Sequence, residues 1–156
     1  QEDVPDLLAE SSEIFRALLV KILAPMPGLF EILEHIESSN LPKAVATSSN
    51  RSYLENILGR YDLQDRFHFT LTAEDVSKGK PNPEIYLRAA ESLGIAPGEM
   101  LVLEDSAAGT KAAAAANAVI VSIPHEHSCT QDFSPATYIA ESLVDPYVLN
   151  LIQSAG

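Results

Sequence analysis

Three short segments of the sequence carry side chains that could bind and activate a phosphate group. The first contains Thr47, Ser48, Ser49 and Asn50, three hydroxyls and an amide directly before a predicted helix. Free N–H groups and partial positive charge at a helix N-terminus favour phosphate binding at such a turn. Serine and asparagine are also common N-cap residues, so helix capping is the alternative interpretation of this segment.

The second segment, residues 78–83, lies in the loop before another predicted helix. Lys80 stands between Gly79 and Pro81 on a constrained backbone, which could direct its ammonium group toward an anion. The alternative is an ordinary solvated lysine, because most lysine side chains are exposed.

The third segment is a pair of adjacent carboxylates, Glu104 and Asp105, at the end of an apolar predicted strand. Carboxylates near a core are energetically unfavourable unless they are paired or bind a metal. Mg²⁺ is usually held by one or two carboxylates together with water and substrate phosphate, so the pair suits this ion. Alternatively, Asp105 or Ser106 caps the following helix.

Taken together, the hydroxyls, the lysine and the carboxylates predict a site for Mg²⁺-assisted phosphoryl chemistry. The metal ion and Lys80 would neutralise phosphate charge, while Thr47 would position the phosphate oxygens.

Two other features of the sequence, a pair of histidines and the single cysteine, are less informative about function. His125 and His127 alternate in a predicted loop without a third convergent ligand, so we expect no zinc site there. Cys129 has no neighbouring cation in the local sequence to activate its thiol.

The hydrophobic pattern predicts strands and helices that alternate along the chain and would bring these segments together. Such alternation is typical of an α/β fold, in which helices cover both faces of a parallel sheet. Ligands of such sheets lie at the carboxyl ends of the strands, where all three segments are expected. The predicted strands are 43–47, 67–71, 100–103, 118–123 and a weaker 137–140, and the predicted helices are 5–23, 29–36, 54–58, 83–93, 106–116 and 145–153.

The composition predicts a single domain with a substantial core and an acidic surface. The chain has 156 residues, is 46% hydrophobic and carries a net charge of −12. Nucleic acid and anionic lipid both select basic surfaces, so neither is an expected partner. No apolar stretch approaches the ~20 residues of a membrane-spanning helix. A single cysteine cannot form an intrachain disulfide, which fits a reducing compartment, and we expect a cytoplasmic protein.

Three blocks of the sequence resemble a known family. Residues 43–49 (KAVATSS), 79–86 (GKPNPEIY) and 102–113 (VLEDSAAGTKAA) resemble motifs two, three and four of the haloacid dehalogenase-like (HAD) superfamily. The blocks occur in the family's order and spacing, and the subgroup they resemble is that of β-phosphoglucomutase and phosphoglycolate phosphatase. The resemblance extends from about residue 25 to residue 123 and implies a HAD-like Rossmannoid fold, a three-layer parallel sheet with helices on both faces.

The resemblance also implies a role for each site residue. The residues that would contact the phosphate belong to motifs two and three: Thr47, Ser48, Ser49 and Lys80. Thr47 would bind the transferring phosphate, and Lys80 would stabilise both this phosphate and an aspartyl-phosphate intermediate. Asp105 would bind Mg²⁺ directly, and Glu104 would bind it directly or through a water molecule.

Two features depart from the family pattern. The first family motif, a strand ending in Asp-x-Asp-Gly-Thr, is missing, and no Asp-x-Asp occurs in the 156 residues. In the family this motif supplies the nucleophile and the general acid, and its strand lies between the strands that carry Thr47 and Asp105. We therefore expect a carboxyl-terminal portion of a longer enzyme, with residues 1–24 as the last helix of a helical cap and 25–156 as the incomplete core. The second departure is Asn117, which replaces the usual glycine after the alanine-rich helix and tolerates a left-handed backbone.

The expected activity is Mg²⁺-dependent hydrolysis or transfer of a phosphoryl group on a small phosphorylated metabolite, by a monomer or a homodimer. Without the nucleophile, we expect this chain alone to be inactive. The alternative is a catalytically dead HAD-like protein that binds phosphate ligands. A receiver-type signalling domain would need a phospho-accepting aspartate at a strand end before Thr47, and none is present.

Overall fold

A computed structural model describes residues 26–156, and its elements follow the predicted alternation of strands and helices. The predicted helix at 5–23 and the proposed cap segment 1–24 lie outside the described residues. The other predicted strands and helices are all present, with boundaries that differ by a few residues. The α/β fold class is therefore confirmed. None of the helices in the described part is long and apolar enough to cross a membrane.

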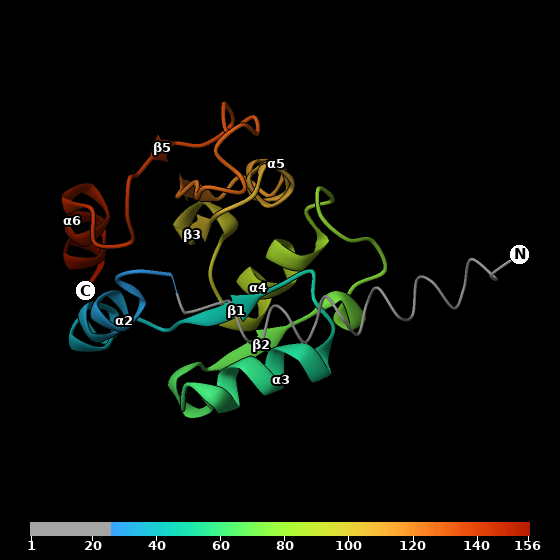
Figure 1. The fold of residues 1–156 in the computed structure, drawn as a ribbon, viewed down its shortest axis with the longest axis horizontal. Helices are drawn as coiled ribbons and strands as arrows, with labels where there is room; N and C mark the ends of the chain where they lie inside the picture. Colours follow the sequence, from blue (N-terminus) through green and yellow to red (C-terminus); the bar gives the residue numbers. More distant parts are fainter. Residues whose placement is uncertain (1–25) are drawn as a thin grey trace, which may run out of the picture.

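The first sheet consists of two parallel strands, β1 (Ala44–Ala46) and β2 (Phe69–Leu71), with Val45 opposite Thr70. The helix α3 (Arg51–Arg60) connects them and runs alongside the two strands in Figure 1. Parallel strands need a crossover of this kind, because a short turn cannot return the chain to the same end of the sheet.

The second sheet contains three parallel strands in the order β3 (Leu101–Glu104), β4 (Val119–Ser122) and β5 (Tyr138–Ile139). The helix α5 (Ala107–Ala115) connects β3 to β4. At its end Asn117 has a φ of 62°, so asparagine does adopt the left-handed conformation expected where the family has glycine.

Helices cover both faces of the second sheet. On one face, α4 (Glu84–Leu93) and α5 pack on a cluster that includes Ile120. On the other face, α2 (Leu29–Ser38) and α6 (Pro146–Ala155) pack on a cluster that includes Val121. Ile120 and Val121 are neighbours in β4 and point to opposite faces, and they are 2% and 0% exposed. The central strand of this sheet is thus buried on both sides, as the continuous apolar run predicts.

Two of the sheet edges without a partner strand among the described residues, at β1 and at β3, are linked at their carboxyl ends by Lys80. Next to β1, the Thr47 N–H donates to Leu71 O, and Lys43 O accepts from the backbone N–H of His68. The backbone N–H and C=O groups of Ala44 and Ala46 therefore point away from β2. In β3, the carbonyl oxygens of Met100 and Glu104 accept from the backbone N–H groups of Val119 and Ile123. The backbone N–H and C=O groups of Leu101 and Leu103 therefore point away from β4. The expected strand between β1 and β3 remains a prediction.

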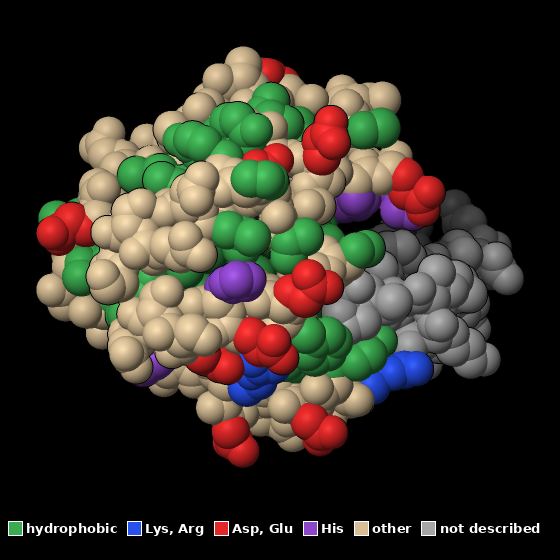
Figure 2. Space-filling view, turned by 90° about the vertical axis from the view of Figure 1, so that its left-hand side faces the viewer, with side chains coloured by type: hydrophobic (Ala, Val, Ile, Leu, Met, Phe, Trp, Pro, Cys, Tyr) green, Lys and Arg blue, Asp and Glu red, His purple; other side chains and the backbone are tan. Residues whose placement is uncertain are grey.

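The surface is predominantly acidic, in agreement with the net charge of −12. On the face shown in Figure 2, acidic side chains are scattered widely and basic ones are few. Glu37 at the end of α2 accepts from Arg66 at 2.8 Å and pairs with Lys43 at 3.0 Å. The Arg66 hydrogen bond, followed by that of Lys43, lowers the pKa of Glu37 to about 2. These ion pairs link α2 to the residue before β1 and to the 3₁₀ turn η1 (Gln64–Arg66).

Candidate functional site

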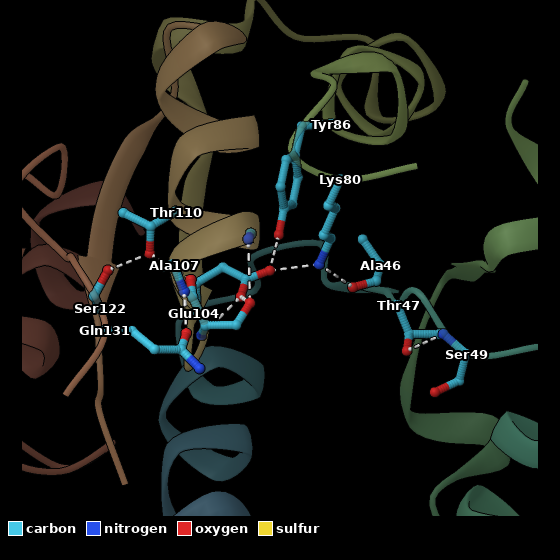
Figure 3. Close-up of polar contacts among 12 residues, drawn as sticks. Ala46, Thr47, Ser49, Lys80, Tyr86, Glu104, Ala107, Thr110, Ser122 and Gln131 are labelled. Atoms are coloured by element: carbon cyan, nitrogen blue, oxygen red, sulfur yellow. Dashed lines mark hydrogen bonds and ion pairs between the residues drawn. The ribbon is translucent and has the colours of Figure 1, made fainter. Parts of the chain in front are cut away.

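The predicted site residues follow the carboxyl ends of β1 and β3, as expected for an α/β sheet. Thr47 follows the last residue of β1, and Glu104 is the last residue of β3. Lys80 comes from the loop before α4 and lies between these two strand ends in Figure 3. The structure thus brings the second and third predicted segments into direct contact, beside the first.

Lys80 is a buried, paired lysine, so the interpretation as a solvated surface residue is wrong. Its side chain is only 8% exposed. The Nζ atom donates to the carbonyl oxygen of Ala46 at 3.2 Å and to Oε1 of Glu104. Pro81 and Asn82 shape the loop: the Lys80–Pro81 peptide bond is cis, and Asn82 Oδ1 accepts from the first backbone N–H of α4 at 3.0 Å. The ammonium group therefore joins the ends of the two sheets.

Glu104 is a buried carboxylate whose two oxygens both accept hydrogen bonds. Oε1 accepts from Lys80 and from the hydroxyl of Tyr86, and Oε2 accepts from Ser106 Oγ at 3.1 Å. A Cβ atom at Gly109 would lie only 2.0 Å from the carboxylate carbon, so the carboxylate rests directly on that glycine. The hydrogen bonds from these partners offset the desolvation penalty that an unpaired buried carboxylate would carry in full.

Tyr86 is a site residue to which the sequence interpretation gave no role. It lies in the first turn of α4, is 4% exposed and donates to Glu104. Burial, together with the negative charge of Glu104, raises the pKa of Tyr86 above its usual range. The phenol therefore remains protonated and acts as a donor. Its position within residues 79–86, at the apolar spacing of α4, was the available signal, but that spacing equally predicts a core aromatic.

Asp105 differs from its neighbour because its side chain is exposed. It is 52% exposed, and its Oδ2 lies 3.4 Å from Nε2 of His125. The helix α5 is capped by Ser106, whose Oγ accepts from the Gly109 N–H at 3.1 Å. Capping by Asp105 is thus not what the structure shows, and its carboxylate can serve as a ligand. His125, which the sequence left without a role, lies beside this carboxylate.

In the turn after β1, the hydroxyl groups of Thr47, Ser48 and Ser49 do not cap the following helix. Asn50 caps α3, because its Oδ1 accepts from the Tyr53 N–H at 2.8 Å. Thr47 Oγ1 accepts from the Ser49 N–H at 3.1 Å and retains its own hydrogen for donation to a ligand. Ser48 is exposed. The capping alternative therefore explains Asn50 but not the three hydroxyls before it.

A second network fixes the position of this turn. Ala73 N–H donates to Ser49 O at 3.1 Å, which attaches the turn to the segment after β2. Arg51 donates to Thr70 Oγ1 at 3.0 Å and to Asp75 Oδ2 at 2.5 Å. Asp75 also accepts from the backbone N–H of Thr72, which is the main reason that its pKa is lowered. The sequence interpretation did not identify this network, because its members are distant in sequence.

No group of three or more His, Cys, Asp or Glu side chains that could hold a metal ion occurs within residues 26–156. The donor set still fits Mg²⁺, which commonly takes one or two protein carboxylates and completes its shell with water and phosphate. Asp105 offers an exposed carboxylate, whereas both oxygens of Glu104 already accept hydrogen bonds.

The fold and the site define an α/β protein of the HAD type, with a hydroxyl turn, a buried lysine and a carboxylate pair at adjacent strand ends. The family model described as Haloacid dehalogenase-like hydrolase matches residues 1–123. The chain belongs to the haloacid dehalogenase-like hydrolase family.

Among known proteins, the chain is similar to several phosphatases. It is 31% identical over 143 residues to the bifunctional riboflavin kinase/FMN phosphatase of Arabidopsis thaliana, covering 91% of this chain and 38% of that protein. It is 38% identical over 96 residues to the phosphorylated carbohydrates phosphatase of Thermotoga maritima, covering 62% of this chain and 44% of that protein. The chain therefore spans about half the length, or less, of these curated relatives.

Solved structures show the same fold. The structure of CbbY from Rhodobacter sphaeroides in complex with phosphate superposes with a TM-score of 0.80 at 24% identity, covering 94% of this chain and 68% of that one. A HAD family hydrolase from Deinococcus radiodurans R1, with bound phosphate and sodium, superposes with a TM-score of 0.68 at 28% identity. That match covers 75% of this chain and 55% of the other.

Proposed function

We propose that the protein to which these residues belong is a Mg²⁺-dependent phosphatase or phosphomutase that acts on a small phosphorylated metabolite, as a monomer or homodimer in the cytoplasm. The observation that carries this proposal is the position of Lys80. Its ammonium group is held by Glu104 and by the Ala46 carbonyl at the ends of β1 and β3. A fixed cation at the carboxyl edge of a parallel sheet suits a phosphate group.

The relatives support a phosphorylated metabolite as the substrate. The Thermotoga maritima relative is a phosphatase of phosphorylated carbohydrates, and the Deinococcus radiodurans structure holds a phosphate. The acidic surface of this chain, with a net charge of −12, favours a small ligand over a polyanion such as nucleic acid.

Each predicted residue has a distinct task in this proposal. Lys80 stabilises negative charge on the phosphate oxygens, and the Thr47 hydroxyl donates to one of them. The turn of Ser48 and Ser49 lines the phosphate position, next to the N-terminus of α3 and its partial positive charge. These groups orient the phosphorus for attack and stabilise the charge that develops there.

Asp105 would hold Mg²⁺ directly, and Glu104 would contribute through a water molecule, because its oxygens accept from Lys80, Tyr86 and Ser106. When bound, Mg²⁺ neutralises phosphate charge and orients the reacting group. Glu104 then serves mainly to hold Lys80 in place.

In this proposal the nucleophile comes from outside these 156 residues, which contain no Asp-x-Asp pair. A carboxylate would attack phosphorus and release the alcohol, and water would then hydrolyse the acyl phosphate and regenerate the carboxylate. A general acid would protonate the departing alcohol oxygen.

The test is a comparison of Asp105→Asn with Asp65→Asn in the protein expressed from its complete gene. Asp65 is an exposed carboxylate in η1, so its variant is a matched control. Phosphate release from a panel of sugar phosphates is measured with Mg²⁺ and with EDTA. We expect EDTA or Asp105→Asn to lower kcat/KM by about 100-fold or more, and Asp65→Asn to leave it unchanged. Full activity of Asp105→Asn, or in EDTA, would contradict the proposal.

The absence of an Asp-x-Asp pair favours one second candidate, a phosphate-binding protein without catalysis. In that case inorganic phosphate and Mg²⁺ raise the melting temperature of the protein from the complete gene, because ligands that bind the native state stabilise it. No phosphate ester is then hydrolysed. Turnover in the same panel excludes this candidate.

A further inference from the structure

Tyr86 contacts both members of the buried ion pair that places the cation of the site. Its hydroxyl donates to Glu104 Oε1, the same oxygen that accepts from Lys80. The Lys80 Nζ atom also lies 5.0 Å from the centre of the Tyr86 ring, a distance at which the ring face attracts a cation. Figure 3 shows Tyr86 and Lys80 converging on the Glu104 carboxylate.

These contacts matter because lysine is a long, flexible side chain. Four rotatable bonds let its ammonium group move through several positions unless neighbouring groups fix it. Here the Ala46 carbonyl fixes one direction and Glu104 fixes another, while the tyrosine ring limits a third side. The position of Lys80 thus depends on how firmly Glu104 itself is held.

Glu104 is held from opposite sides. Ser106, the N-cap of α5, donates to Oε2, and the carboxylate lies directly against Gly109. Tyr86 is the donor that reaches the carboxylate from α4, the helix whose preceding loop carries Lys80. The α4 helix and the loop directly before it therefore supply both the cation and the group that orients its counterion.

We infer that Tyr86 is a positioning residue for Lys80: its hydroxyl orients Glu104 and its ring confines the ammonium group at the end of β1. This inference rests on the proposed function in so far as Lys80 acts on a phosphate. Because Tyr86 is 4% exposed and its hydroxyl donates to Glu104, it acts in this inference through Glu104 and Lys80 rather than on the substrate.

The experiment compares Tyr86→Phe with Tyr147→Phe in the protein expressed from its complete gene. Tyr86→Phe removes the hydroxyl and retains the ring, whereas Tyr147 is a 37% exposed tyrosine on α6 and serves as the control. The first measurement is independent of activity. Lysine acetylation under limiting reagent is followed by mass spectrometry, and the rate at Lys80 is divided by the rate at Lys111, which is exposed on α5.

We expect this ratio to be low in the unaltered protein, to rise several-fold in Tyr86→Phe and to stay low in Tyr147→Phe. Glu104→Gln, which removes the charge that holds Lys80, should raise the ratio as well. Under the proposed function, Tyr86→Phe also lowers kcat by about 10-fold with little change in KM, because a hydrogen bond to a charged group is lost.

The two proposals fail in different ways. If the unaltered protein hydrolyses no phosphate ester, the proposed function fails, and the acetylation ratio alone decides the role of Tyr86. A ratio in Tyr86→Phe equal to that of the unaltered protein overturns the inference, as does an unchanged kcat in an active enzyme. If Tyr86→Phe does not fold, a low ratio in Glu104→Gln overturns it, and a raised ratio there supports it.

Discussion

Gly109 permits the close approach on which the Glu104 carboxylate depends. The Cβ of any other residue would lie 2.0 Å from the carboxylate carbon, a distance that no packed pair of atoms tolerates. Gly109 lies inside α5, where glycine is intrinsically unfavourable compared with alanine. Packing rather than helix propensity therefore determines the residue type at this position.

Gly109→Ala should lower the free energy of unfolding by about 1–3 kcal/mol, because Glu104 must move and the surrounding core is close-packed. Displacement of Glu104 should also release Lys80 and reduce phosphate ester hydrolysis by the protein from the complete gene. Urea denaturation measures the first effect, and a steady-state assay measures the second.

Gly59→Ala is the matched control for this substitution. Gly59 also lies in a helix, α3, but its Cβ would meet no described atom nearer than 3.5 Å. Helix propensity should therefore dominate and raise the free energy of unfolding by up to about 1 kcal/mol. Equal stability changes in the two variants would show that Glu104 does not rest on Gly109 as the structure indicates.

The site could be predicted from the sequence only in part. Thr47, Lys80 and Glu104 could be predicted because they lie at strand ends or just before a helix. Such positions share one edge of a parallel sheet. Tyr86 and Gly109 were not, because their roles arise from the packing of α4 and α5 against β3. Periodicity predicts that these residues face inward but not which polar group they meet.

Two of the helices that follow the site turns, α3 and α5, begin with a side-chain cap, whereas α4 begins at Pro83 without one. Asn50 caps α3, and Ser106 caps α5. Asp145 caps α6, where its Oδ1 accepts from Tyr147 N–H at 2.8 Å. A capped start fixes the direction in which the preceding turn enters the helix. The turn from Thr47 to Asn50 thus depends on the cap of α3.

Asn50→Ala should lower the free energy of unfolding by about 1 kcal/mol, because the Tyr53 N–H loses the oxygen that satisfies it. Asn50→Asp retains a capping oxygen and should keep most of the stability. Urea denaturation of both variants measures the difference. A stability of Asn50→Ala equal to that of the unaltered protein would mean that the cap contributes nothing.

The element boundaries were largely predictable, with one consistent exception. The 3₁₀ turns η1, η2 (Ala73–Asp75) and η3 (Pro97–Glu99) were not predicted. Each is only three residues long and is defined by local hydrogen bonds such as Asp75 N–H to Thr72 O at 3.1 Å. Hydrophobic periodicity needs a longer window, so it identifies the ten-residue helix α4 but not these turns.

The arrangement of the two sheets concerns the molecule as a whole. β1 and β3 each have one edge that no described strand covers, and Lys80 links their carboxyl ends. Exposed strand edges tend to be covered in native proteins, because their N–H and C=O groups otherwise invite pairing with other chains. The proposed function requires a nucleophile close to Lys80. A strand between β1 and β3 would meet both requirements at once.

Hydrogen exchange can test this arrangement in the protein expressed from its complete gene. If a strand lies between β1 and β3, the amides of Ala46 and Leu103, which face that edge, should be protected from exchange. Val45 and Val102 face β2 and β4 and should be protected in any case, so each strand contains its own control. Exchange of Ala46 and Leu103 at least about 100-fold faster than their neighbours would show that no strand pairs there, because an amide in an open edge needs no unfolding to exchange. The nucleophile would then have to reach Lys80 from another element.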